Sequence, residues 1–251
     1  MNSNCKAPKL LQQLVEWEGS FAHEVAYLEK PSGLFLGLDY SQDGYFCTPV
    51  DSIPFASTGG DGIHFALLTD FGVVKDLEEA LVIRVSPMDN ERVRIVAKNI
   101  NDFFSLHFYH ESLAWNEFQN EDRYLSHLQE EQSRDSDSEW FDHDRWKFEK
   151  GKVLNEVKNR FNILPIEQPF SYINNLRIER SFQVTVNTLD SIGTKQFMPA
   201  VSNETIEMLV LVRHLQHTCS DDKTLINRIA NDLRLLGYNH EADSLVSRLF
   251  I

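Results

Sequence analysis

The sequence predicts an α+β protein, in which an antiparallel sheet is flanked by helices and followed by a mainly helical C-terminal region. Two observations carry this prediction. Between residues 33 and 98, short apolar runs alternate with turns rich in glycine and aspartate, which is typical of antiparallel strands. Before and after this stretch, apolar side chains recur at the 3.6-residue spacing of amphipathic helices.

The strongest turn is Gly59-Gly60-Asp61-Gly62, which lies between the apolar runs 45–56 and 63–68. Glycine adopts positive φ without a steric penalty, and Asp-Gly between two such runs indicates a hairpin. We therefore expect these four residues to be a structural turn that joins two adjacent strands.

The other elements of the first half follow in order. Residues 9–29 form a helix, which Gly19 is expected to interrupt, and Asn99 caps a second helix after the sheet. The remaining strands are expected at 34–38, 80–85 and 92–97, where apolar runs are β-branched or alternate with polar residues.

The second half reads as mainly helical. Helices are expected at 111–133, 140–161, 202–217, 220–236 and 239–249, with one strand at 181–188. This pattern predicts three parts: an α+β domain at 1–130, an acidic linker or loop at 131–144, and a helical region at 145–251 that packs on the first domain or stands apart from it.

Composition narrows the class of protein. A hydrophobic content of 42%, with 17 Phe and 4 Trp in 251 residues, can supply a real core. No apolar run approaches the roughly 20 residues that span a bilayer, and the first residues lack the pattern of a signal peptide. Three widely spaced cysteines fit a reducing compartment, so we expect a cytoplasmic protein.

The excess of negative over positive charge is confined to the first 150 residues. Residues 1–110 carry 15 acidic and 8 basic side chains, residues 111–150 carry 12 and 5, and residues 151–251 carry 11 and 11, which gives the net −14. Such a surface repels nucleic acid and attracts a basic protein, unless it serves solubility alone. The expected partner-binding residues are Asp70, Asp76, Glu78, Glu79, Asp142 and Asp144.

A family resemblance lies in the same stretch. Its residues are 53–56, the Gly-rich turn with Ile63-His64-Phe65-Ala66-Leu67-Leu68, then 80–85, and 96–104 with Asn99 and Phe103-Phe104. Together they resemble the SUKH superfamily, which includes Smi/Knr-type cell-wall regulators, Syd proteins and many bacterial immunity proteins. The resemblance covers about 33–110. Residues 10–30 lack the family's usual opening motif, and residues 150–251 lie outside it. It implies a non-enzymatic domain that presents a sheet face or edge to a protein.

Candidate catalytic and metal-binding residues are few. The Gly-rich turn lacks the Lys-Ser/Thr and the helix of a phosphate-binding loop. Asp61, His64 and Asp70 are the side chains that an acid–base or metal site would use. The histidine pairs His107/His110 and His214/His217 lack a second pair of zinc ligands. We therefore expect no metal and no cofactor.

Two functions remain open. The first is a protein-binding module, either an immunity protein that neutralises a basic toxin or a regulatory scaffold. The second is a small hydrolase or metal-dependent enzyme that uses Asp61, His64 and Asp70. A pocket with convergent polar groups near Asp61 would favour the enzyme. The oligomeric state and the identity of the partner are left open by the sequence.

Overall fold

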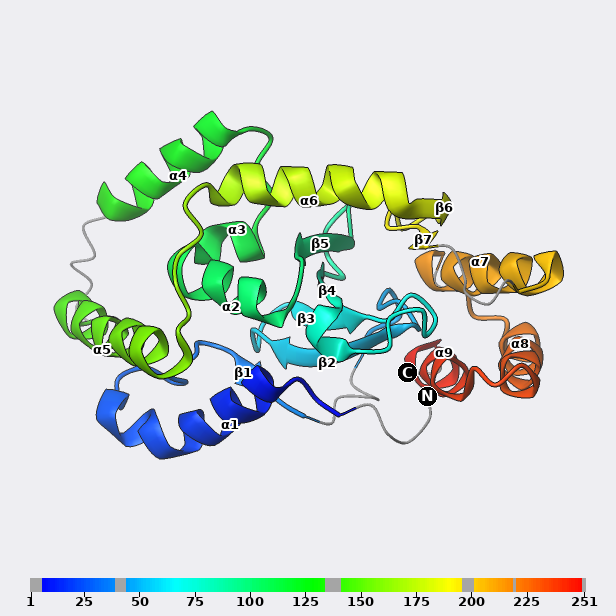
Figure 1. The fold of residues 1–251 in the computed structure, drawn as a ribbon, viewed down its shortest axis with the longest axis horizontal. Helices are drawn as coiled ribbons and strands as arrows, with labels where there is room; N and C mark the ends of the chain where they lie inside the picture. The colour runs from blue at the N-terminus through cyan, green and yellow to red at the C-terminus, as the bar shows by residue number, and fades with distance from the viewer. Residues whose placement is uncertain (1–5, 39–43, 134–140, 196–200, 219, 250–251) are drawn as a thin grey trace.

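The computed structural model describes residues 6–38, 44–133, 141–195, 201–218 and 220–249, and a five-stranded antiparallel sheet lies at its centre (Figure 1). Each strand pairs with its neighbour in sequence, in the order β1-β2-β3-β4-β5. The predicted sheet and the α+β class are confirmed. The bounds are Phe35–Leu36 (β1), Ser52–Ser57 (β2), His64–Leu68 (β3), Leu81–Val85 (β4) and Val93–Ala97 (β5).

The Gly-rich turn joins β2 and β3, as predicted. Gly59 and Gly62 have φ values of 79° and 69°, which lie in the region that favours glycine. A Cβ atom at Gly62 would lie only 2.9 Å from Cζ of Tyr45. Both the backbone angle and the close approach of Tyr45 therefore require glycine at this position.

Three helices cover one face of the sheet: α1 (Lys9–Phe21), α2 (Ile100–Tyr109) and α5 (His143–Phe161). Helix α2 begins where predicted, because the Asn99 side chain accepts a hydrogen bond from the amide of Asp102 at 2.9 Å. Its Phe103 packs edge-to-face on Phe55 of β2, with ring centroids 5.2 Å apart. The 3₁₀ turn η1 (Ala22–Val25) follows α1 and contacts α5.

Helix α6 (Pro169–Gln183) covers the edge strand β5 and part of the opposite face. Nε of Arg177 donates to the carbonyl of Ile95 at 3.2 Å, and the amide of Lys98 donates to the Tyr172 hydroxyl at 2.8 Å. Covering an edge in this way removes backbone groups that could pair with another chain. A short hairpin of β6 (Val184–Val186) and β7 (Thr194–Lys195) follows α6.

Three element predictions are wrong. Gly19 does not interrupt the first helix, because α1 runs through it to Phe21. The helix expected at 111–133 is two helices, α3 (Glu111–Trp115) and α4 (Glu121–Ser133), because the backbone is extended at Asn116 and Asn120 caps a new helix. The strand expected at 181–188 is only β6, because α6 runs on to Gln183. Of the predicted acidic linker, residues 134–140 lie outside the described residues.

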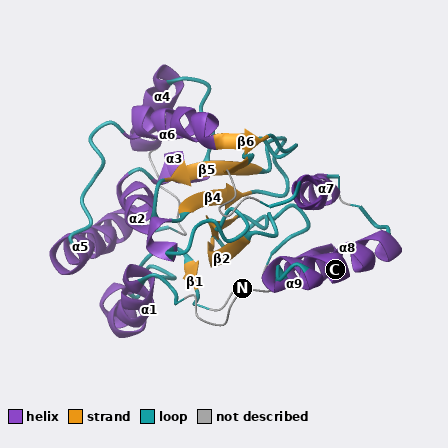
Figure 2. Cartoon of the chain, turned by 45° about the vertical axis from the view of Figure 1, so that its right-hand side comes forward, coloured by secondary structure: helices purple, strands orange, loops and turns teal. Residues whose placement is uncertain are grey.

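The last helices form where predicted: α7 (Asn203–His217), α8 (Lys223–Leu235) and α9 (Asn239–Leu249). The side chains of Ser202 and Asp222 cap α7 and α8. Figure 2 shows these helices on the side of the sheet opposite α1, α2 and α5. Their apolar side chains share a separate core with Val50 and Phe71, which come from the first half of the chain.

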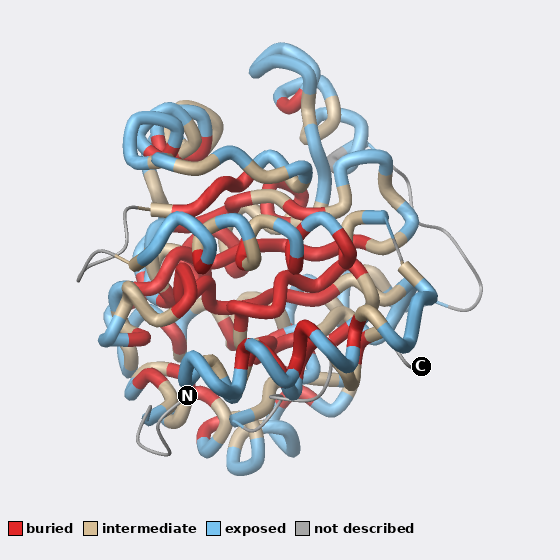
Figure 3. Tube along the Cα trace, turned by 90° about the vertical axis from the view of Figure 1, so that its right-hand side faces the viewer, coloured by how far each residue is buried: buried red, intermediate tan, exposed pale blue. Residues whose placement is uncertain are grey.

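Helices α5 and α6, which follow residue 144, belong to the same hydrophobic core as the first half of the chain. Val153 and Val157 of α5 and Ile173 of α6 belong to the same buried cluster as Leu14 and Phe103. Figure 3 shows the buried trace running through the strands and the inner faces of the surrounding helices. In the described part of the chain, no helix has both the length and the apolar character needed to cross a bilayer.

Candidate functional site

Asp61 and His64 both belong to the β2–β3 hairpin, but one is exposed and the other is buried. Asp61 is exposed at the tip, with φ of 51°. His64 is buried, with Nδ1 2.8 Å from the carbonyl of Gly62 and Nε2 2.9 Å from Oγ1 of Thr48. A carbonyl can only accept, so Nδ1–H is the donor, and in the neutral ring Nε2 then accepts from the Thr48 hydroxyl. Burial lowers the pKa of His64 to about 4.

Asp70 is not a surface residue, so its predicted place in a partner-binding surface is wrong. Only 1% of Asp70 is exposed. Its carboxylate oxygens accept hydrogen bonds from Nη1 and Nη2 of Arg180 at 2.9 and 2.6 Å. Arg180 also donates to the carbonyls of Ile192 and Gly193. The pair fastens α6 and the β6–β7 loop to the turn after β3.

A second buried ionic cluster lies nearby, where Arg213 of α7 donates to Asp51 at 2.9 Å and also to Asp190. Burial raises the pKa of Asp51, whose Oδ1 has no hydrogen-bond partner among the described residues. Burial opposes ionisation of Asp190 as well, but Arg213 and hydrogen bonds from Thr188 and the backbone lower its pKa. The cluster joins three distant parts of the chain.

Two further side chains of the C-terminal helices bind the backbone before β2. The Gln216 amide accepts from the amide of Val50 at 2.9 Å and donates to the carbonyl of Thr48. Arg248 donates to the carbonyls of Thr48, Pro49 and Ser52. The amide of Val50 and the carbonyl of Thr48 are thereby paired in the interior, where an unpaired backbone group would be costly.

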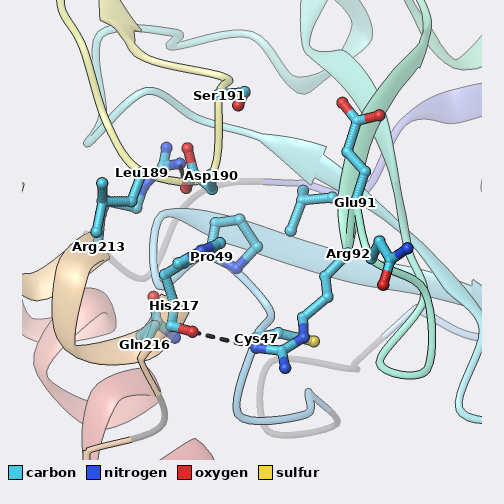
Figure 4. A pocket seen from close by; sticks show the side chains of 12 residues that line it. Cys47, Pro49, Glu91, Arg92, Leu189, Asp190, Ser191, Arg213, Gln216 and His217 are labelled. Atoms are coloured by element: carbon cyan, nitrogen blue, oxygen red, sulfur yellow. Dashed lines mark hydrogen bonds and ion pairs between the residues drawn. The ribbon is translucent and has the colours of Figure 1, made fainter.

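A pocket of about 300 Å³ lies at this junction (Figure 4). Its walls come from the loop before β2, the β4–β5 turn, the β6–β7 loop and α7. Arg213 and Gln216 in its wall already make the contacts described above, and Arg92 donates to the carbonyl of His217 at 3.1 Å, at the C-terminal end of α7. These polar groups hold the α7–α9 unit against the sheet rather than converging on an empty position.

The three residues expected for acid–base chemistry therefore do not share contacts. His64 binds Thr48 and Gly62, Asp70 binds Arg180, and Asp61 is exposed. Within the described residues, no group of three or more His, Cys, Asp or Glu side chains is placed to hold a metal ion. His107, which belongs to the histidine pair His107/His110, is buried, and its Nε2 lies 2.6 Å from the carbonyl oxygen of Ser32 in a hydrogen bond.

A different pocket, which we call the α6 pocket, has the properties of a binding site. Its volume is about 400 Å³, and it lies between residues 73–81, α6 and β7. The apolar part of its lining is Val73, Val74, Leu81 and Leu176. The charged side chains in the lining, apart from Arg180, are Lys75, Lys98, Lys195, Asp76, Glu79 and Glu179.

None of those six side chains forms an ion pair within the part of the chain that the structure describes. This contrasts with the ionic clusters in the interior, where Asp70 and Asp190 are paired with arginine. Two residues of the predicted partner surface, Asp76 and Glu79, thus line a pocket. That pocket carries as many lysines as carboxylates, which the charge count alone did not predict.

The other predicted partner-binding residues lie elsewhere. Glu78 accepts a hydrogen bond from the amide of Lys9, at the start of α1. Asp142 caps α5, and its own amide donates to the Tyr27 hydroxyl, beyond the end of α1. Helix α1 has 13 residues, or about 20 Å at 1.5 Å per residue. Asp142 and the exposed Asp144 therefore form a second acidic site, separate from Asp76, Glu78 and Glu79.

Several site residues were missed from the sequence: Lys98, Glu179 and Lys195 at the α6 pocket, and Arg180, Asp190 and Arg213 in the interior. One signal was available for Arg213, because it follows the apolar run Met208-Leu209-Val210-Leu211-Val212 in a helix that must bury one face. No comparable local signal marks Lys98 or Lys195, which are brought together by the fold alone.

Comparison with protein-family models finds no match for this chain, and comparison with curated proteins finds none either.

Proposed function

We propose that this protein is a non-enzymatic binding module that contacts a protein partner through the α6 pocket. One observation carries the proposal: six charged side chains, which line the pocket together with four apolar ones, make no ion pairs with one another or with other described residues. Charges left unpaired at a surface pocket are available to a partner, whereas those of the interior are already neutralised.

The partner that fits this pocket carries a basic side chain for Asp76, Glu79 and Glu179. The aliphatic stem of a lysine or arginine would lie on Leu81 and the other apolar side chains, with its charge beside the three carboxylates. The three lysines then restrict the choice of partner, because a uniformly basic surface would be repelled by them. The net charge of −14 would also speed the approach of a basic partner.

The resemblance to the SUKH superfamily supports the same class of function. It favours an immunity protein that neutralises a basic toxin, or a regulatory scaffold. We place this binding protein in the cytoplasm, in keeping with its three widely spaced cysteines. No feature of the described residues favours the alternative of a hydrolase or metal-dependent enzyme, since Asp61, His64 and Asp70 do not share a site.

The proposal is tested with two bait variants of the full chain. Asp76→Lys/Glu79→Lys changes the α6 pocket, and Glu204→Lys/Glu207→Lys makes the same change in charge at exposed positions on α7. We expect a partner captured by the wild type to be lost by the pocket variant and kept by the α7 variant. With the purified partner, the pocket variant should associate at least about tenfold more slowly at low salt. A partner that binds both variants equally would contradict the proposal.

A further inference from the structure

Helix α5 presents a basic face, although the chain as a whole carries −14. It has six basic and three acidic side chains, a balance of +3. Lys147, Phe148 and Lys158 are exposed, on the side of the helix opposite the buried Val153 and Val157. Phe148 is 66% exposed. Neither lysine makes a hydrogen bond or ion pair with the residues that the structure describes.

Helix α4 has the opposite charge and is weakly packed. Four carboxylates and one arginine give it a balance of −3. Among its described side chains, Tyr124 alone is buried. Asp122, Leu125 and Glu130 are exposed, and Leu125 is 48% exposed. A polar helix of 13 residues is marginal by itself, because most helical stability in proteins comes from packing.

The two exposed faces match in kind, and the flexible four-carbon stem of lysine can bridge the difference between their charge spacings. Each combines one apolar side chain with two like charges, and the charges on one face are opposite to those on the other. Lys147 and Lys158 lie about 16 Å apart along α5, and Asp122 and Glu130 lie about 12 Å apart along α4. We propose that α4 of one copy docks on α5 of a second copy, with Leu125 against Phe148 and the carboxylates beside the lysines.

A second copy is the partner that this arrangement favours. Figures 1 and 2 place α4 and α5 at the same end of the molecule, away from α7–α9. A two-fold axis at that end would bring α4 of each copy to α5 of the other, so the same contact forms twice. An extended polyanion is disfavoured, because the whole chain carries −14 and α5 carries +3, which leaves −17 around the basic face.

The oligomeric state of the full chain tests the proposal. Light scattering after gel filtration should give twice 29.1 kDa at low salt and less at high salt, where screening weakens surface charge pairs. Lys147→Glu/Lys158→Glu should raise the dimer dissociation constant at least about tenfold, since like charges would then face each other. Asp122→Lys/Glu130→Lys should do the same.

Mixing the two variants provides the decisive measurement. In the mixture, each reversed helix meets a reversed partner, so a heterodimer should form although neither variant dimerises alone. Lys6→Glu/Arg228→Glu changes the net charge by the same amount as the α5 variant, at exposed positions before α1 and on α8, and it should remain dimeric. Circular dichroism verifies that each variant is folded. A monomeric wild type would overturn the proposal, and so would a dimer that the variants leave intact or that mixing does not restore.

Discussion

Arg180 donates to both carboxylate oxygens of Asp70, at 2.9 and 2.6 Å, and both side chains are buried. The two residues lie 110 positions apart in sequence, so the pair forms only when α6 lies across the turn after β3. Removing one partner from a buried pair leaves an uncompensated charge, whereas replacing both with apolar groups costs far less. We therefore expect the fold to tolerate replacement of both residues better than the loss of one of them.

We expect Asp70→Ala to lower the free energy of unfolding by about 3–5 kcal/mol, because it leaves Arg180 buried without its carboxylate. The double variant Asp70→Leu/Arg180→Met should lose less than Asp70→Ala alone, because it leaves no buried charge and costs only the bonds of Arg180 to the carbonyls of Ile192 and Gly193. Urea denaturation measures both. As a control, Asp243→Ala breaks the exposed pair with Arg234 and should change stability by less than about 1 kcal/mol. A double variant as unstable as Asp70→Ala would contradict the argument.

Gln216→Glu should loosen the attachment of α7 to the loop before β2. The new carboxylate can still accept from the amide of Val50 but cannot donate to the carbonyl of Thr48, and it adds a buried charge. We expect a loss of about 2–3 kcal/mol in denaturation. Hydrogen exchange at the amide of Val50 should quicken as well. Gln13→Glu, at an exposed position, is the matched control and should change neither quantity.

Gly62→Val should destabilise the hairpin, and Asp61→Asn should not. Valine at φ 69° is strained, and its Cβ would lie 2.9 Å from the ring of Tyr45. The expected loss is about 1–3 kcal/mol or more. Asparagine tolerates the left-handed conformation of residue 61, where φ is 51°. Denaturation midpoints compare the two variants, and equal midpoints for Gly62→Val and wild type would refute the role given to Gly62.

Acidification should weaken the fold through His107. Burial lowers the pKa of this histidine to about 4, below its ordinary value of 6.5. Between these two values the unfolded chain binds more protons than the folded one, so this contribution to stability is present above pH 6.5 and is lost as the pH falls toward 4. From pH 7 to 5 the loss is about 2 kcal/mol.

His107→Gln removes this titrating group, so its free energy of unfolding should change less between pH 7 and pH 5 than that of the wild type. The comparison uses the difference between the two pH values, which separates the titration from the general loss of the contact with Ser32. An equal pH dependence in both proteins would mean that His107 does not contribute to it.

Local patterns determined the sheet and most helices. The alternation of strands and turns between residues 33 and 98, the Gly59–Gly62 turn and the caps Asn99, Ser202 and Asp222 all follow from preferences that act within a few residues. Where a local pattern was misleading, the neighbouring element decided the outcome. Residues 181–183 alternate like a strand, but the helix that begins at Pro169 continues through them, because extending an existing helix adds a hydrogen bond for each residue that is fixed.

The tertiary structure alone decided what the charged residues do. In sequence, Asp70 belongs with Asp76 and Glu79 as one acidic group, yet Asp70 pairs with Arg180 in the interior while the other two line the α6 pocket. An aspartate is equally hydrophilic in both places, and only the chain that folds over it determines whether water or an arginine neutralises its charge. The sequence by itself thus determined the strands of the sheet and most of the helices, while the fold determined which charges are structural and which are available to a partner.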